Sequence, residues 1–201
     1  MKFSIVIASL LIPYVGSARD KEKKLVRAVA SAQNQTFRDF EIIVVADGCE
    51  KTMEIIKDTI NVRSFLIPRG KMFSGGPRDK GIEEAQGEYI VYLDIDDIYG
   101  LKHLEKINSH LNSYDWVWYN DIRWNSKWYE NHCDIYQIGK HGTSNICHKR
   151  SLGVRWDING YAHDYHFVRK LFKFKNFAKI PTPEYYVAHV PATGRHGGYD
   201  I

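Results

Sequence analysis

Three carboxylates, Asp94, Asp96 and Asp97, fall within four residues of the stretch YIVYLDIDDIYG, residues 89–100. They follow an apolar run that is typical of a buried strand. Carboxylates this close repel one another, and burial beside a strand adds a desolvation cost, so a bound cation is expected to stabilise them. The stretch therefore predicts a site for a positively charged ligand where this strand ends.

Four interpretations compete for this acidic stretch. A calcium loop of the EF-hand type starting at Asp94 would place Ile98 and Tyr99 where an oxygen ligand and a glycine are needed. A phosphatase-like aspartyl nucleophile normally ends the first strand of its domain, not the fourth, and needs a nearby hydroxyl residue that is absent here. A structural interpretation makes Asp97 a cap for the helix that follows. The fourth interpretation is a D-x-D site for a metal ion and a diphosphate, formed by Asp94 and Asp96.

The elements that position these carboxylates alternate along the chain. Apolar, β-branched runs predict buried strands at residues 3–9, 40–48, 62–68 and 88–97. Amphipathic segments predict helices at residues 21–35, 51–60 and 101–111. Residues 74–87 predict a Gly-rich loop and then a short helix that begins near Pro77 and stops at Gly87. The alternation predicts an α/β fold, with a mixed, mainly parallel central sheet flanked by helices. Ligands bind at the carboxyl ends of strands in such sheets, which is where Asp47, Asp94 and Asp96 are expected.

The second half of the chain is less regular. It has a Trp-rich segment at residues 116–128, a strand expected at 143–150, a helix at 163–174 and a last strand at 184–190. Most of the Trp rings are expected to fill the core, and stacking on a bound sugar is the alternative. No internal repeat, low-complexity tract or linker is visible.

Composition limits the class of protein. The 201 residues suit one domain, and 44% apolar and 26% charged residues are ordinary globular values. The net charge of +4 comes without a basic stripe, which argues against a nucleic-acid partner. The cysteines, Cys49, Cys133 and Cys147, are odd in number and scattered, so they indicate neither a disulfide framework nor a zinc cluster. A reducing, cytoplasmic location is expected, either free or at a membrane surface.

The N-terminus has two interpretations. Residues 1–18 combine a lysine, an apolar run and small residues, as a signal peptide does. A first buried strand at residues 3–9 is favoured, because only one basic residue precedes the run and a βαβ pattern follows it. No run approaches the roughly 18–20 apolar residues of a membrane-spanning helix, so no transmembrane segment is predicted.

An ordered series of segments resembles the large inverting glycosyltransferase family 2, which has the GT-A fold. FSIVIAS stands where that family has its opening strand, and VRAVASAQNQTFRDFEIIVVADG resembles its helix, turn and second strand. GPRDKGIEEAQGEYIVYLDIDD resembles its block A-R-N-x-G…A-x-G-E-Y-I…L-D-x-D-D. The D-x-D alone is a weak signal, but the series at the family's spacing is a strong one. It runs from residue 3 to about residue 97 and more weakly beyond.

The resemblance implies one GT-A domain over residues 1–201, with a nucleotide-binding half at 1–97 and an acceptor-binding half at 98–201. It implies an enzyme that moves a sugar from a nucleotide-diphosphate donor, a UDP-sugar such as UDP-glucose, to a glycan or other hydroxyl acceptor. Such enzymes serve glycan or polysaccharide biosynthesis. The sequence does not indicate the transferred sugar, the acceptor, the linkage or the oligomeric state.

The chain departs from the family pattern in the nucleotide pocket. ASLLIP replaces the usual Pro-Thr-Tyr-Asn, Ala46-Asp47 replaces paired aspartates, and Arg78-Asp79 replaces Arg-Asn. The resemblance still implies that Asp47 meets the base and that Arg78 meets the base or the diphosphate through its forked donors. These departures bear on the identity of the base more than on the fold.

The resemblance also implies a metal site. The last Asp of D-x-D, Asp96, would bind the metal, and Asp94 would lie near the ribose. Oxygen ligands select Mn²⁺ or Mg²⁺, and the metal would neutralise the diphosphate leaving group. A late histidine completes the site in the family: His189 in YYVAH matches, and His196 in GRHGG is the rival.

The acceptor hydroxyl needs a general base, and inversion requires a carboxylate on the face opposite the leaving group. The family supplies it from an E-D pair at a helix start. WDINGYAHDYHFVRKL matches, with His163 in place of Glu and Asp164 as the base. Capping of the helix is the alternative role for Asp164, and His163 and Asp157 are the next candidates for the base. His163 and Trp156 are expected on the acceptor side.

Two other functions remain open. A nucleotidyltransferase could hold Mg²⁺ at Asp94 and Asp96, but it would be expected to carry a Gly-rich first loop with a lysine, which ASLLIPYVGSARDK does not match well. A non-catalytic module could bind a sugar nucleotide or glycan without turnover. The presence of both Asp96 and Asp164 argues against the second.

Overall fold

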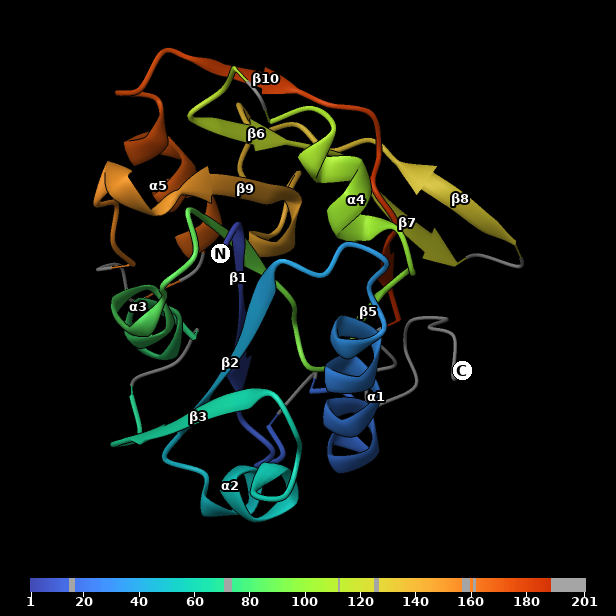
Figure 1. Ribbon diagram of the computed structural model, residues 1–201, viewed down its shortest axis with the longest axis vertical. Coiled ribbons are helices and arrows are strands. Elements are labelled where there is room, and N and C mark those ends of the chain that lie inside the picture. The colour runs from blue at the N-terminus through green and yellow to red at the C-terminus, as the bar shows by residue number, and fades with distance from the viewer. Residues whose placement is uncertain are drawn as a thin grey trace.

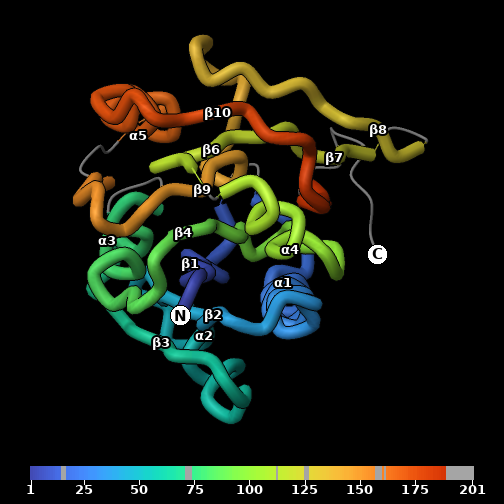
Figure 2. The backbone as a smooth tube through the Cα atoms, turned by 45° about the horizontal axis from the view of Figure 1, so that its top comes forward, coloured from blue at the N-terminus to red at the C-terminus, as the bar shows by residue number. Residues whose placement is uncertain are grey.

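The computed structural model describes residues 1–14, 17–70, 74–111, 113–124, 127–156, 160 and 162–188. Within these ranges, seven strands form one sheet in the order β10–β6–β9–β4–β1–β2–β3, and Figure 2 shows them succeeding one another from β3 at the bottom to β10 at the top. Their bounds are β1 (Phe3–Ser9), β2 (Phe40–Asp47), β3 (Val62–Ile67), β4 (Tyr89–Tyr92), β6 (Trp116–Trp118), β9 (Ile146–Lys149) and β10 (Phe177–Lys179). Strands β3, β2, β1 and β4 run parallel, and β9 runs antiparallel to both β4 and β6. The predicted mixed, mainly parallel sheet is confirmed.

Strand β1 lies inside this sheet, paired with β2 on one side and β4 on the other. All its residues except Ala8 are buried. Burial on both faces explains why the sequence here is an unbroken apolar and β-branched run instead of an alternating one. These residues are a strand of the sheet, so the signal-peptide interpretation of them is wrong.

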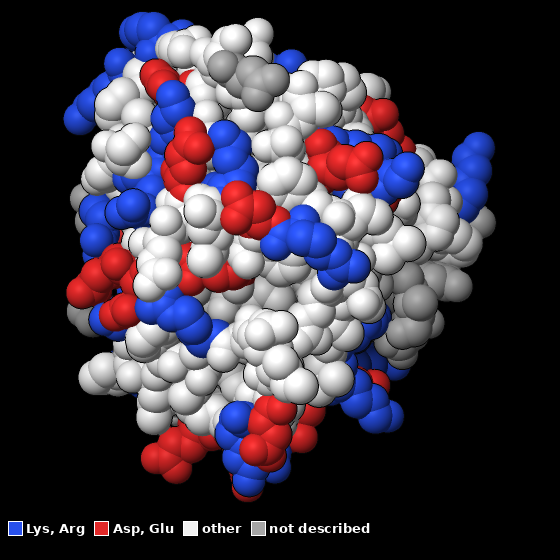
Figure 3. All heavy atoms as spheres, in the orientation of Figure 1, with Lys and Arg blue, Asp and Glu red and all other residues white. Residues whose placement is uncertain are grey.

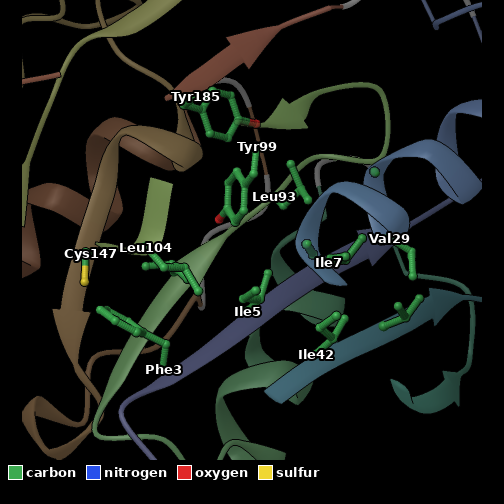
Figure 4. Close-up of a cluster of buried hydrophobic side chains, with 14 of the residues drawn as sticks. Phe3, Ile5, Ile7, Val29, Ile42, Leu93, Tyr99, Leu104, Cys147 and Tyr185 are labelled. Atoms are coloured by element: carbon green, nitrogen blue, oxygen red, sulfur yellow. The ribbon is translucent and has the colours of Figure 1, made fainter. Parts of the chain in front are cut away.

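Helices cover both faces of the sheet, with α1 and α4 on one side and α3 and α5 on the other in Figure 1. Their bounds are α1 (Lys21–Gln33), α2 (Glu50–Ile56), α3 (Gly75–Glu84), α4 (His103–Asn108) and α5 (His163–Leu171). Apolar residues of α1, α2 and α4 join one core cluster, and those of α3 and α5 join a second cluster on the other face. Figure 4 shows the first cluster, where Ile5 and Ile7 of β1 lie close to Ile42 of β2 and Val29 of α1.

Helix α3 approaches β1 closely because Gly81 has no side chain. A Cβ atom at this position would lie 2.3 Å from Cγ1 of Val6, a distance that no real Cβ tolerates. The close contact with Val6 therefore requires a glycine at position 81, the second glycine of the block GPRDKG. A larger residue would push α3 off the sheet and carry Arg78 with it.

A smaller second sheet was not predicted. It has the strand order β5–β11–β7–β8. Its strands are β5 (Ile98–Tyr99), β7 (Asp121–Trp124), β8 (Trp128–Asn131) and β11 (Tyr185–Val187). The Trp-rich segment divides between the sheets: Trp116 and Trp118 are buried in the central sheet, as expected of core residues. Trp124 and Trp128 instead pack edge to face in the second sheet, with ring centres 5.3 Å apart.

The central sheet takes strands from both predicted halves of the chain, since β1 to β4 precede residue 98 and β6, β9 and β10 follow it. A single domain over residues 1–201 stays a prediction, as does the division into nucleotide-binding and acceptor-binding halves. In the ranges that the structure describes, the helices are all too short or too polar to cross a membrane.

Glu41 ties the start of β2 to the turn before β4. Its carboxylate accepts hydrogen bonds from Ser4 Oγ at 2.6 Å, from Gln86 N at 2.6 Å and from Arg63 Nη1 at 2.7 Å. Burial raises the pKa of Glu41, but these hydrogen bonds outweigh burial and hold the pKa below its usual value. The ionised carboxylate thus adds stability at neutral pH, which is lost as the pH falls through this lowered pKa.

Glu41→Gln is expected to lower the free energy of unfolding by about 1–3 kcal/mol at pH 7, because the amide weakens the pairing with Arg63 and offers the backbone N–H groups a poorer acceptor. Urea denaturation measures the change. Glu54→Gln, in an exposed pair with Lys51, is the matched control and should leave stability nearly unchanged. The difference between Glu41→Gln and wild type should shrink in acid, and equal stability at pH 7 would contradict the assignment.

Candidate functional site

A cleft of about 430 Å³ lies at the carboxyl ends of β1, β2 and β4. Residues from these strand ends, the loops that follow them and the helices α1, α3 and α5 line it: Ala8, Leu10, Tyr14, Lys21, Asp47, Arg69, Ser74, Arg78, Asp94, Ile95, Asp96 and His163. This is the edge at which open α/β sheets bind ligands. The cleft brings together five predicted site residues: Asp47, Arg78, Asp94, Asp96 and His163.

Asp47, the last residue of β2, is fixed at the cleft wall by the chain that follows β3. Its Oδ1 accepts a hydrogen bond from Gly70 N at 2.7 Å, and its Oδ2 lies 3.9 Å from Arg69 Nε. Gly48 follows with a φ of +61°, and a Cβ there would lie 2.5 Å from Cβ of Arg69. The glycine is therefore needed both for the turn after β2 and for the close approach of Arg69.

Arg78 connects the acidic turn after β4 with the start of α5. Its Nη2 donates to Asp94 Oδ1 at 2.8 Å, and its Nη1 lies 3.0 Å from His163 Nε2. Its Cζ lies 5.2 Å from the centre of the Trp156 ring. Because a guanidinium can only donate, His163 Nε2 must accept, and the proton of the neutral imidazole is on Nδ1. One side chain thus sets the orientation of Asp94 and the tautomer of His163.

Arg78→Gln is expected to raise the pKa of His163. Burial first, and the positive charge of Arg78 second, hold that pKa below its usual value, and the substitution removes the charge. NMR titration of the imidazole signals measures the shift. The imidazole signals of His110, which is exposed and does not line the cleft, serve as the internal reference. A His163 pKa that does not move would show that the guanidinium is not beside the ring in solution.

The turn after β4 places its carboxylates in different surroundings. Asp97 N donates to Asp94 O at 3.1 Å, which closes the turn. Asp94 and Asp96 line the cleft, whereas the Asp97 side chain is buried against β11. Its Oδ2 accepts from Tyr185 Oη at 2.6 Å and its Oδ1 accepts from Ala188 N at 2.9 Å. Burial first, then the charges of Asp96 and Asp94, raise the pKa of Asp97 well above its usual value.

The interpretation of Asp97 as a helix cap is wrong. Helix α4 has Lys102 at its N-cap position and no side-chain cap. Asp97 instead holds Ala188 beside the acidic turn, across 91 residues of sequence. The residue that follows, the predicted metal ligand His189, lies outside the described residues, as do its rival His196 and the alternative base Asp157.

The acidic turn suits a divalent metal that shares its coordination with a substrate. Among the described residues, no three or more His, Cys, Asp or Glu side chains are grouped for a metal. Asp94 and Asp96 nevertheless offer carboxylate oxygens, the ligands that Mg²⁺ and Mn²⁺ prefer. Mg²⁺ is commonly bound by one or two carboxylates together with substrate phosphates. Arg78 holds Asp94 at 2.8 Å, and Asp96, two residues further along the turn, also lines the cleft.

Tyr14, Lys21 and Arg69 line the cleft but were not predicted from the sequence. Lys21 is 7% exposed, and its Nζ donates to Ile12 O at 2.9 Å and lies 4.3 Å from the centre of the Tyr14 ring. Burial lowers the pKa of Lys21, opposed by the charge of Asp96. The nearest signal in the sequence was ASLLIP, which departs from the family pattern and ends directly before Tyr14.

Asp164 and Trp156 are not among the residues that line the cleft. Asp164 is the second residue of α5, and its Oδ1 accepts from Tyr165 N at 2.8 Å. The N-cap position belongs to Ala162, which provides no side-chain cap. Trp156 is 4% exposed and stacks on Phe167 with ring centres 3.9 Å apart, so its ring supports Arg78 from the core. The base role of Asp164 and an acceptor contact of Trp156 stay predictions.

Comparison with curated proteins finds glycosyltransferases. The chain is 38% identical over 92 residues to the cholesterol galactosyltransferase of Borreliella burgdorferi, an alignment that covers 44% of this chain and 25% of that protein. It is 34% identical over 83 residues to the GalNAc(5)-diNAcBac-PP-undecaprenol beta-1,3-glucosyltransferase of Campylobacter jejuni, covering 39% of this chain and 27% of that protein. The chain thus spans only about a quarter of the length of these relatives.

Solved structures share the fold at low identity. TarS of S. aureus, residues 1–349 in complex with UDP-GlcNAc, superposes with a TM-score of 0.71 at 17% identity, over 92% of this chain and 58% of that one. The mannosyltransferase PcManGT from Pyrobaculum calidifontis, in complex with GDP-Man and Mn²⁺, superposes with a TM-score of 0.67 at 11% identity. That superposition covers 96% of this chain and 58% of the other. The GT-A fold implied by the sequence is confirmed by this likeness.

The family profile described as glycosyl transferase family 2 matches residues 9–180, from the end of β1 to just beyond β10. The match includes the D-x-D turn, the Arg78 helix and the start of α5. The chain therefore belongs to glycosyl transferase family 2.

Proposed function

We propose that this chain transfers a sugar from a nucleotide-diphosphate donor to a hydroxyl group of an acceptor, with inversion at the anomeric carbon. The observation that carries the proposal is the cleft at the carboxyl edge of the sheet, where Asp47, Arg78, Asp94 and Asp96 converge in a chain of family 2. TarS has been solved with UDP and with UDP-GlcNAc, and PcManGT with GDP-Man, which supports a nucleotide-sugar donor. A UDP-sugar, such as UDP-glucose, is the proposed donor.

The charge balance of the cleft favours a donor that arrives with a divalent cation. Three carboxylates and three cations line it, in addition to the single imidazole of His163. The cations are Lys21, Arg69 and Arg78. A diphosphate adds two negative charges to this balanced site, and in a partly buried cleft such an excess is costly. A Mn²⁺ or Mg²⁺ ion that enters with the donor restores the balance.

Asp96 is proposed to hold that ion together with the donor phosphates, with His189 as a further ligand and His196 as its rival. When bound, the ion supplies Lewis-acid stabilisation of the diphosphate leaving group. An imidazole ligand would favour Mn²⁺ over Mg²⁺. PcManGT has been solved with Mn²⁺, which supports a metal in this fold. Asp47 is proposed to accept from the ring N–H of the base, and Asp94 to lie near the ribose.

Asp164 is proposed to take the proton from the acceptor hydroxyl. The hydroxyl oxygen then forms a bond to the anomeric carbon, the bond from that carbon to the phosphate oxygen breaks, and the nucleoside diphosphate leaves. His163 is a poor rival while Arg78 donates to its Nε2, because its other nitrogen then carries the proton. The orientation of His163 therefore favours Asp164 as the base.

A cytoplasmic location, free or at a membrane surface, belongs to the same proposal. Cys49, Cys133 and Cys147 are all free thiols, which is the usual state in a reducing compartment. The acceptor is a glycan or another molecule with a free hydroxyl group.

Thermal unfolding with a panel of donors tests the function. A UDP-sugar at 100 times its dissociation constant should stabilise the native state by about 2.7 kcal/mol, which raises Tm by roughly 5–10 °C for a protein of this size. The shift should require Mn²⁺ or Mg²⁺, and uridine, which lacks the diphosphate, is the matched control. Failure of every UDP-, GDP-, dTDP- and CMP-sugar to raise Tm with metal present would refute the proposal.

A further inference from the structure

A second groove, of about 520 Å³, lies at the other end of α5 from the cleft. Three aromatic and three basic side chains line it: Tyr136, Phe172, Phe177, Arg169, Lys173 and Lys175. Figure 3 shows Lys and Arg side chains gathered at the upper left, over the end of α5. No carboxylate lines the groove, and within the described ranges none of its three basic side chains forms a salt bridge.

The aromatic floor of this groove is fixed by the core. Tyr136 stacks on Phe172 with ring centres 5.3 Å apart and planes at 8°, and Phe177 stacks on the buried Trp116 at 4.2 Å. Arg169 Cζ lies 5.9 Å from the centre of the Phe172 ring. Tyr136 still remains 61% exposed. The rings are therefore held in place before a ligand arrives, so binding orders few side chains.

Helix α5 connects the groove to the proposed site of reaction. Its first residues are His163 and Asp164, and its last turn carries Arg169. Nine residues of helix span about 13 Å, so an extended acceptor that reacts beside Asp164 reaches the groove within roughly one helix length. The groove is thus placed to hold a distant part of an acceptor, not the sugar being transferred.

We propose that this groove binds an anionic chain of sugar or polyol units, which carries carboxylate or phosphate groups and forms the far end of the acceptor. The units pack on Tyr136 and Phe172, and the anionic groups pair with Arg169, Lys173 and Lys175. A hollow with rings fixed along its floor fits a chain better than a flat bilayer. Ile138, which is 54% exposed close to Tyr136 in sequence, would suit a bilayer, so vesicles form the competing arm of the test. The acceptor role rests on the proposed function, but the binding itself does not.

Fluorescence anisotropy with the full chain tests the binding. The probe is fluorescein-labelled oligogalacturonate, with a dextran oligomer of equal length as the neutral control and vesicles with about 30% phosphatidylglycerol as the membrane arm. Oligogalacturonate should bind at least about tenfold more tightly than dextran, and its affinity should fall as salt screens the cations. Binding to vesicles without binding to oligogalacturonate would overturn the proposal in favour of a membrane surface.

Two groove variants and one control variant locate the binding. Lys173→Gln with Lys175→Gln should weaken oligogalacturonate binding by about tenfold, because two cations are lost. Lys57→Gln with Lys102→Gln makes the same charge change at exposed positions outside the groove and should leave the affinity within about twofold. Tyr136→Ala should weaken binding by about fivefold, because one face of the stacked pair is lost. If both lysine pairs weakened binding equally, the effect would come from net charge alone, and the proposal that the groove is the binding site would be overturned.

Because binding is measured without turnover, the two proposals fail separately. Absence of oligogalacturonate binding, in a protein whose Tm still rises with a UDP-sugar, refutes the groove alone. Binding by a protein that no nucleotide sugar stabilises refutes the proposed function alone.

Discussion

Asp96→Ala is expected to abolish the metal-dependent part of nucleotide binding while the protein stays folded. Asp96 lines the cleft and is the last Asp of the D-x-D, the position to which the family resemblance assigns the metal. One contact that holds the turn is made by the backbone, since Arg27 Nη2 donates to the backbone oxygen of Asp96 at 2.8 Å. The substitution thus removes the carboxylate and keeps that contact.

Calorimetry of UDP binding, with and without Mn²⁺, measures this effect. Wild type should bind UDP at least about tenfold more tightly with the metal, and Asp96→Ala should bind with one affinity under both conditions. Asp58→Ala, at an exposed position, removes the same charge and should behave as wild type. If wild type bound UDP equally well with and without metal, the metal site would be misassigned.

The first half of the fold was readable because three of its strands, β1, β2 and β4, are buried on both faces. The apolar runs of β1, β2 and β4 are typical of strands at the centre of a parallel sheet, and parallel strands end at one edge. Asp47, Asp94 and Asp96 follow strand ends, so the sheet alone brings them to one cleft. These three site residues can therefore be predicted from the local pattern of apolar strands followed by carboxylates.

The second sheet was not readable as a sheet. Strand β11 lies inside the strand expected at residues 184–190, but its partner β5 has only two residues, fewer than the roughly four over which alternation can be recognised. The misreading of Asp97 has the same origin. Its partner Tyr185 lies 88 residues away, whereas the helix that it was thought to cap follows almost directly. The local sequence favoured a helix cap, but in the folded protein Asp97 contacts a residue that is distant in sequence.

The pairing of Arg78 with His163 shows a further limit. Each residue was selected from its own motif, but they are 85 residues apart and their 3.0 Å contact has no signature in either segment. The contact nevertheless has a chemical consequence, because it assigns the proton of His163 to Nδ1. The sequence left His163 open as a rival base, and the geometry weakens that role.

Asp164→Asn is therefore expected to lower kcat for transfer to the acceptor by about 10²–10⁴, the usual loss when general acid–base assistance is removed. The fold should survive, since the Asn side-chain oxygen can still accept the hydrogen bond from Tyr165 N that Asp164 Oδ1 accepts at 2.8 Å. Donor affinity should also stay close to wild type, because Asp164 does not line the cleft proposed to bind the donor. The loss should appear in kcat, because proton abstraction matters in the transition state.

The decisive comparison is the rate of glycosyl transfer at saturating donor and Mn²⁺, for wild type, Asp164→Asn and His163→Gln. If Asp164 is the base, His163→Gln should lower the transfer rate by less than about tenfold, since it disturbs only the contact with Arg78. Asp164→Asn should then lower the rate by at least about ten times more than His163→Gln does. The reverse order would make His163 the base and would require Arg78 to release it when the donor binds. Transfer by Asp164→Asn within a few-fold of wild type would assign Asp164 to stabilising the first turn of α5, where a carboxylate is favoured by the helix dipole. The base would then be sought at His163 or Asp157.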